Sequence, residues 1–141
     1  MQVSAKLAPT FDYPVLERFW RSADELGFPP AVWNYDHFYG LVDPTTPTLE
    51  GWTSLSAMAV VVRRARVGCL VSGVTYRNPA VLAKMAVTVD HISGGRLDFG
   101  IGGAGWHEDE HRGYGIDFPS PGGERVAMVD EALTVIRRLW T

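Results

Sequence analysis

Short apolar runs alternate along this chain with longer segments in which apolar residues recur every three or four positions. The short runs are typical of strands, and the longer segments are typical of helices with one buried face. The pattern therefore predicts strands over residues 3–7, 31–35, 67–72 and 96–101, and helices over about 14–26, 49–62, 79–92 and 126–140.

Residues that begin or end helices support these boundaries. Asn78 is a favoured N-cap, and Pro79 suits the first helical position because it needs no hydrogen bond for a backbone N–H. Asp12 or Tyr13 stands at the start of the first predicted helix, and Gly27 ends it.

The spacing of the predicted strands indicates the fold class. The strands begin near residues 3, 31, 67 and 96, and intervals close to 30 residues are the length of a strand–helix unit. Such units form parallel α/β sheets with active sites at the carboxyl ends of the strands. The spacing alone does not distinguish a small doubly wound sheet from part of a barrel.

Composition excludes several classes of protein. With 141 residues, 46% of them hydrophobic, the chain suits one globular domain. No apolar run approaches the ~20 residues of a membrane span, and Met1 precedes no signal-peptide core. The single cysteine, Cys69, allows no internal disulfide, so we expect a cytoplasmic protein.

Charge argues against nucleic-acid binding. The formal net charge is −3, whereas a nucleic-acid surface needs a basic face. The one basic cluster, Arg63, Arg64 and Arg66, follows a predicted helix, where cations offset the helix dipole. We therefore interpret this cluster as structural.

Chemically capable side chains follow the second and third predicted strands. His37 lies in the string Tyr35-Asp36-His37-Phe38, where it could bind or protonate a planar ligand. The alternative is a solvated turn histidine with Asp36 capping the loop. Ser72 could donate to a ligand carbonyl or simply close the strand.

Two apparent motifs do not fit their usual context. Residues 100–105 match G-x-G-x-x-G, but no helix opens within the glycines, so a loop that lets a ligand ring approach backbone fits better than a dinucleotide site. Residues 107–111 match H-E-x-x-H, but Gly105 and Gly113 leave seven residues between them, too few for the zinc-binding helix. We expect no stable helix there and no metal site.

A set of short strings in a fixed order closely resembles a known family. The set extends from about Leu16 to Trp140 and resembles the bacterial-luciferase-like flavin-dependent oxidoreductases, particularly their deazaflavin (coenzyme F420) branch. The strings are DHF at 36–38, YRNPA at 76–80, LAKMA at 82–86, ISGGRL at 92–97, FGIG at 99–102, GWHE at 105–108 and YG at 114–115.

The resemblance implies a (β/α)₈ barrel with a flavin ring across the carboxyl ends of the strands. Coenzyme F420 is the implied cofactor, with FMN as the alternative, for hydride transfer to a small organic substrate or its oxygenation. His37 would donate or accept a proton. The resemblance also implies a non-proline cis peptide bond near residues 69–71. The cofactor would contact Asp36, Cys69, Leu70, Val71, Ser72 and Gly102, and the substrate would contact Trp106 and Glu108.

A complete barrel needs about 250 residues, so the resemblance makes this chain its N-terminal half, with about four strand–helix units. We expect a single domain over 1–141, truncated on its C-terminal side, without the later strands that hold the cofactor phosphate. Open sheet edges predict self-association or a homodimer. The alternative is a catalytically silent half-barrel that acts only as a folding or interaction module.

Overall fold

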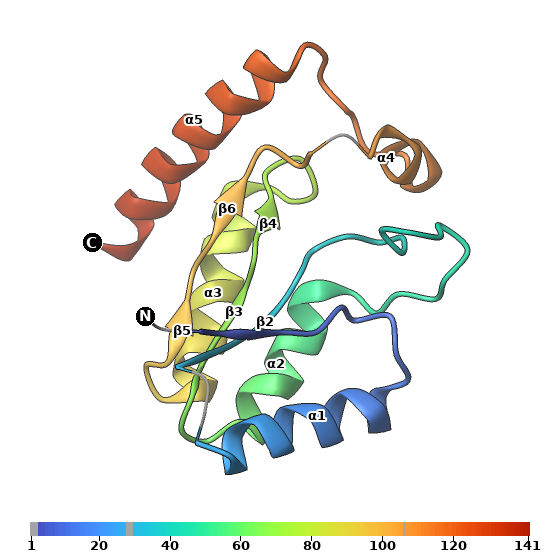
Figure 1. Cartoon of the computed structure of the whole chain (residues 1–141). Helices are drawn as coiled ribbons and strands as arrows, with labels where there is room; N and C mark the ends of the chain where they lie inside the picture. The colour runs from blue at the N-terminus through green and yellow to red at the C-terminus, as the bar shows by residue number, and fades with distance from the viewer. Residues whose placement is uncertain (1–2, 28–29, 106) are drawn as a thin grey trace.

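Strands and helices alternate through the computed structural model, which describes residues 3–27, 30–105 and 107–141 (Figure 1). Every strand pair in it is parallel, which confirms the α/β class. The main sheet has the order β1-β2-β3-β5. Its strands are β1 (Ala5–Lys6), β2 (Ala31–Asn34), β3 (Arg66–Cys69) and β5 (Leu97–Asp98).

A second, two-stranded sheet continues from the main one. It pairs β4 (Ser72–Gly73) with β6 (Ile101–Gly102). The predicted continuous strands 67–72 and 96–101 are therefore wrong, because each is divided in two. Leu70 still donates its N–H to Asn34 of β2, whereas Ser72 donates to Gly100, so the backbone changes partner where β2 ends.

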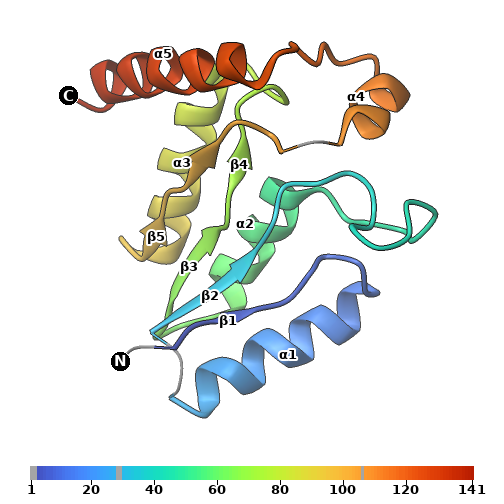
Figure 2. The same ribbon diagram turned by 45° about the horizontal axis from the view of Figure 1, so that its top comes forward.

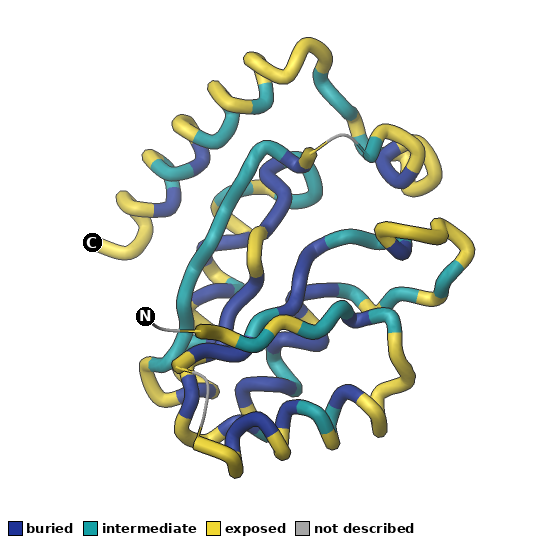
Figure 3. The backbone as a smooth tube through the Cα atoms, in the orientation of Figure 1, coloured by how far each residue is buried: buried dark blue, intermediate teal, exposed yellow. Residues whose placement is uncertain are grey.

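Within the described residues there are five helices, and four of them correspond to predicted ones. They are α1 (Tyr13–Glu25), α2 (Gly51–Val61), α3 (Pro79–Ser93) and α5 (Gly122–Trp140); the fifth is the short α4 (Glu108–Tyr114). Helix α5 lies against α3, as Figure 2 shows. Much of α5 is exposed, whereas buried residues lie along β2, β3 and β4 and on one side of α1, α2 and α3 (Figure 3). None of the helices in the described ranges is long and apolar enough to cross a membrane.

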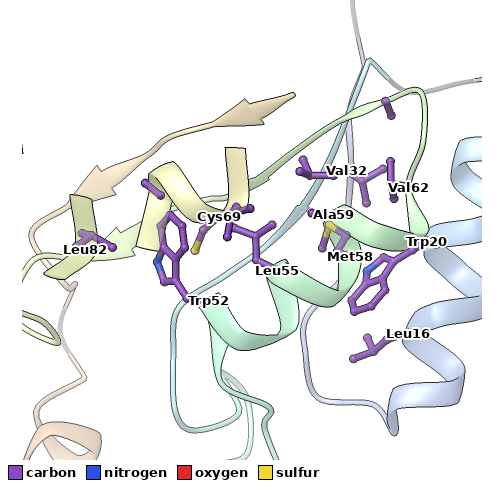
Figure 4. Close-up of a cluster of buried hydrophobic side chains, with 14 of the residues drawn as sticks. Leu16, Trp20, Val32, Trp52, Leu55, Met58, Ala59, Val62, Cys69 and Leu82 are labelled. Atoms are coloured by element: carbon purple, nitrogen blue, oxygen red, sulfur yellow. The ribbon is translucent and has the colours of Figure 1, made fainter. Parts of the chain in front are cut away.

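The hydrophobic core lies between the main sheet and helices α1, α2 and α3 (Figure 4). Each fully buried large apolar side chain of this kind stabilises a fold by about 1.5–3 kcal/mol. The core therefore anchors β2 and β3, whose carboxyl ends lead to the candidate site. Fully buried examples are Leu16, Trp20, Val32, Leu55, Met58 and Val67.

Both neighbouring residues and side chains from other elements bond to the ends of the helices. Asn78 accepts a hydrogen bond from the N–H of Ala80 at 2.9 Å, which confirms the predicted start of α3. The basic cluster has structural partners, as predicted, and those of Arg64 lie on another helix. Arg64, which follows α2, donates to the carbonyl of Glu25 in α1 at 2.9 Å, whereas Arg96 donates to the carbonyl of Val62 at 2.8 Å.

Candidate active site

Two segments far apart in the sequence meet at the carboxyl ends of the strands. His37 follows β2, and Glu110 belongs to α4. Nδ1 of His37 lies 2.8 Å from Oε1 of Glu110. The other carboxylate oxygen accepts the backbone N–H groups of Phe38 at 3.0 Å and Tyr39 at 3.3 Å, so Glu110 holds both the ring and the loop that carries it.

A third side chain completes this group. Tyr76, in the segment between β4 and α3, donates its hydroxyl hydrogen to Oε1 of Glu110, and its oxygen lies 3.4 Å from Nδ1 of His37. We call His37, Tyr76 and Glu110 the histidine cluster. Tyr76 also stacks on His111 at 4.8 Å between ring centroids, which restricts its position further.

The protonation states of the cluster follow from burial and hydrogen bonding. Burial opposes ionisation of Glu110, but hydrogen bonds from His37 and Tyr76 and the charge on His37 outweigh it and lower its pKa to about 2. Burial raises the pKa of Tyr76 far above its ordinary value, and Glu110 adds to the shift. At neutral pH Glu110 is therefore a carboxylate, and Tyr76 is an uncharged donor.

The His37 ring remains partly open to solvent. Its side chain is 22% exposed, against 1% for Glu110. Its ring centroid lies 5.4 Å from that of Tyr35 and 4.8 Å from that of His107. Among the hydrogen bonds formed within the described part of the chain, none uses Nε2 of His37. Nε2 is therefore the ring nitrogen that remains available for a hydrogen bond to a ligand.

Asp36, beside His37 in sequence, is held in a different group. Its carboxylate receives two hydrogen bonds from Arg77, at 2.6 and 2.8 Å, and one from the N–H of Gly73 at 3.1 Å. Burial raises the pKa of Asp36, and the Arg77 guanidinium opposes that shift. Arg77 also pairs with Glu50, the N-cap of α2. Asp36 thus joins the end of β2 to β4 and to the segment before α3, and its contact with a cofactor stays a prediction.

The end of β3 presents side chains to two sides. Cys69 is buried, and burial raises the pKa of its thiol. Ser72 accepts a hydrogen bond from the indole N–H of Trp52 at 3.0 Å, so its hydroxyl lies in the core. Leu70 and Val71, in contrast, are 45% and 41% exposed. The peptide bond between them is cis, which confirms the prediction made for residues 69–71.

Glycines allow the neighbouring strand to pack closely against Val71. A Cβ atom built on Gly102 would lie 2.8 Å from Cγ2 of Val71, and one on Gly100 would lie 3.0 Å from its Cγ1. These distances are shorter than ordinary carbon contacts. Gly102 therefore contributes to this edge through its missing side chain, and its predicted contact with a cofactor stays untested.

The predicted substrate residues lie around α4. Trp106 falls outside the described residues. The Glu108 side chain is 67% exposed and lines a hollow of about 400 Å³ together with Tyr39, Leu41 and His107. The hollow thus adjoins the histidine cluster, since Glu110 also lines it. A larger hollow lies between α3 and α5 and contains none of the predicted site residues.

The expectation that no helix forms within residues 107–111 is wrong, because α4 begins at Glu108. The zinc interpretation still has no geometric support. His111 donates from Nδ1 to the carbonyl of His107 at 2.8 Å, and its Nε2 lies 2.7 Å from the Thr75 hydroxyl, so both ring nitrogens have partners. The described ranges contain no group of three or more side chains able to hold a metal ion.

Sequence reasoning missed Tyr76, Arg77 and Glu110. The signal for α4 was the order of charges: acidic residues occupy its first turn, and basic residues occupy its last. This order complements the helix dipole. Tyr76 and Arg77 directly precede the Asn78 N-cap, and this position between a strand and a helix was their signal.

Comparison with known proteins gives a consistent result. The pattern of the family described as luciferase-like monooxygenase matches residues 2–141. A phthiodiolone/phenolphthiodiolone dimycocerosates ketoreductase from Mycobacterium sp. (strain JLS) is 34% identical over 131 residues, which cover 89% of this chain and 33% of that protein. The chain thus spans about a third of the length of the curated relatives it matches.

Solved structures show the same fold. Monooxygenase RslO1 from Streptomyces bottropensis has a TM-score of 0.81 and 29% identity, over 99% of this chain and 43% of its own. An F420-dependent secondary alcohol dehydrogenase, solved with an F420-acetone adduct, has a TM-score of 0.82 and 22% identity. The match covers 99% of this chain and 42% of that enzyme. The four strand–helix units therefore correspond to less than half of each similar enzyme.

Proposed function

Because this chain belongs to the luciferase-like monooxygenase family, we propose that it forms the ring-binding part of an oxidoreductase that uses coenzyme F420, with FMN as the alternative cofactor. The proposed reaction is hydride transfer to, or oxygenation of, a small organic substrate. We also propose that the protein lies in the cytoplasm, because a single cysteine cannot form an internal disulfide bond.

The observation that carries this proposal is the state of His37. One side of its ring is held by a buried carboxylate, while Nε2 has no partner among the described residues. A partly exposed histidine held in this way is suited to exchange a proton with a bound substrate. It lies at the carboxyl ends of parallel strands, where α/β proteins bind their ligands.

The residues of this edge fit a flat, largely apolar ring. Leu70 and Val71 expose apolar side chains just beyond β3. Gly100 and Gly102 let the adjacent strand pack closely against Val71. Apolar contact of this kind favours binding of an aromatic ring and removes water from around it.

Each residue has a separate role in the proposed chemistry. When bound, the flavin or deazaflavin ring would supply the hydride or react with oxygen. Leu70 and Val71 would contact the ring and exclude water. His37 would move the proton that balances the charge on the substrate, and Glu108 and Trp106 would contact the substrate.

Cofactor titration tests the proposal. We expect oxidised or reduced F420, or FMN, to bind with micromolar affinity, measured by cofactor fluorescence. Val71→Glu places a charge at the proposed ring edge and should weaken binding at least tenfold. Val60→Glu is the matched control, since Val60 is 52% exposed near the end of α2, which leads to the start of β3 rather than to its carboxyl end.

Two outcomes would contradict the proposal. Absence of binding of all the cofactor forms up to about 100 μM would favour the silent half-barrel, whose motivation is the two open edges of the main sheet. Equal binding by Val71→Glu and the native chain would show that the cofactor does not contact this edge.

A further inference from the structure

We infer that Glu110 is a positioning residue for His37: it holds the ring proton on Nδ1 and leaves the lone pair on Nε2. Neither the sequence motifs nor the resemblance assigns Glu110 a role. The importance of this arrangement for catalysis rests on the proposed function, but the arrangement itself can be tested without a cofactor.

The hydrogen bonds around Glu110 determine where the proton of His37 lies. An ionised carboxylate accepts hydrogen bonds and donates none. Nδ1 of His37 lies 2.8 Å from Oε1 of Glu110, so a hydrogen bond there requires a proton on Nδ1. The backbone N–H groups of Phe38 and Tyr39, which donate to the other oxygen, orient the carboxylate toward the ring.

Tyr76 could in principle reverse this assignment by donating to Nδ1 instead. That arrangement would bring the lone pair of Nδ1 against a carboxylate oxygen at 2.8 Å, which is repulsive. The Tyr76 hydroxyl is closer to Oε1 than to Nδ1, from which it lies 3.4 Å. Tyr76 therefore donates to Glu110, and the His37 proton stays on Nδ1.

The other groups around the ring do not compete with Glu110. Tyr35, which follows β2, and His107, which precedes α4, contact the ring at centroid distances of 5.4 and 4.8 Å. Asp36, its neighbour in sequence, is paired with Arg77. Glu110 is thus the carboxylate that contacts His37 among the residues that the structure describes.

Nuclear magnetic resonance of the histidine ring nitrogens tests this inference on the isolated chain. The ¹⁵N shifts of His37, assigned by their loss in His37→Asn, are recorded across a pH titration that includes the neutral ring. We expect Nδ1 to carry the proton and Nε2 to lack it. A neutral ring with its proton on Nε2 in the native chain would overturn the inference.

Four variants separate positioning from simple support of the fold. In Glu110→Gln the amide can donate to Nδ1, so the proton should move to Nε2, as an amide in place of a histidine-bound carboxylate favours the other tautomer. Glu110→Asp keeps the carboxylate and should restore the native tautomer. Tyr76→Phe should leave the tautomer unchanged, and the exposed Glu131→Gln is the charge-matched control.

The outcomes are distinct. An unchanged tautomer in folded Glu110→Gln, or a switched tautomer in Tyr76→Phe, would overturn the role of Glu110, with folding checked by circular dichroism. If no flavin binds but the tautomer follows Glu110, the proposed function fails while the inference holds. If flavin binds but the tautomer does not follow Glu110, the inference fails alone.

Discussion

His37 illustrates how one residue acquires its chemical properties from a distant partner. The sequence places it after a strand and directly beside the carboxylate of Asp36. In the structure Asp36 is bound to Arg77, and the partner of His37 is Glu110, 73 positions away. The proximity of two residues in the sequence was therefore a poor guide to their interaction.

The pKa of Glu110 predicts acid sensitivity of the fold. Its folded value, about 2, lies below its ordinary value of 4.5, so its ionised form stabilises the fold above about pH 4.5. This stability, on the order of 3 kcal/mol, is lost as pH falls from 4.5 toward 2. Urea unfolding between pH 2 and 7 should show a shallower acid dependence in Glu110→Gln than in the native chain or in Glu131→Gln.

Adding a single methyl group at Gly102 should destabilise the fold. Gly102→Ala would place its Cβ 2.8 Å from Val71, and such overpacking costs about 1–3 kcal/mol. We expect a lower melting temperature in thermal unfolding. Gly123→Ala, in α5, is the control, because its Cβ would meet no atom within 4 Å and alanine favours helix. Equal melting temperatures for the two variants would contradict this prediction.

At the scale of elements, the ends of the helices depended on tertiary contacts more than their interiors did. Asn78 caps α3 through a bond to Ala80, two positions away, and this cap was predictable. Arg64 and Arg96 instead donate to carbonyls at the ends of helices they do not belong to. Charge at a helix end can therefore come from any element that packs against it.

Asp24 predicts a loss of stability at one of these junctions. Its carboxylate, at the end of α1, accepts the N–H groups of Arg63, Arg64 and Ala65, each at 2.9 Å. Burial raises its pKa, but these hydrogen bonds outweigh burial and lower it. Asp24→Asn replaces one accepting oxygen by an N–H donor. It should lower the free energy of unfolding, measured with urea, by about 1–3 kcal/mol.

Glu25→Gln is the matched control for this junction, since that neighbouring residue is exposed and contributes its carbonyl rather than its side chain. If Glu25→Gln lowered the free energy of unfolding as much as Asp24→Asn does, the charge at the helix end, and not the three N–H hydrogen bonds, would stabilise the junction.

At the scale of the molecule, the main sheet has two edges. In the order β1-β2-β3-β5, the outer strands β1 and β5 each pair on one side. Apolar residues such as Leu70 and Val71 are exposed beside the sheet. Free strand edges and exposed apolar side chains both favour association with another chain.

We therefore predict that the chain self-associates. Light scattering over a range of concentrations should give a mass above 15.6 kDa, rising with concentration. A constant monomeric mass, together with cooperative unfolding, would contradict the prediction.

The sequence by itself determined the alternation of strands and helices, the start of α3 and the family, because periodicity, caps and short strings are local properties of a chain. It also placed His37 and residues 69–72 at the strand ends. Only the tertiary structure decided that Glu110 and Tyr76 hold His37, that Ser72 bonds to Trp52, and that two strands are each divided. These features depend on contacts between segments far apart in sequence, and such contacts exist only after the helices pack against the sheet.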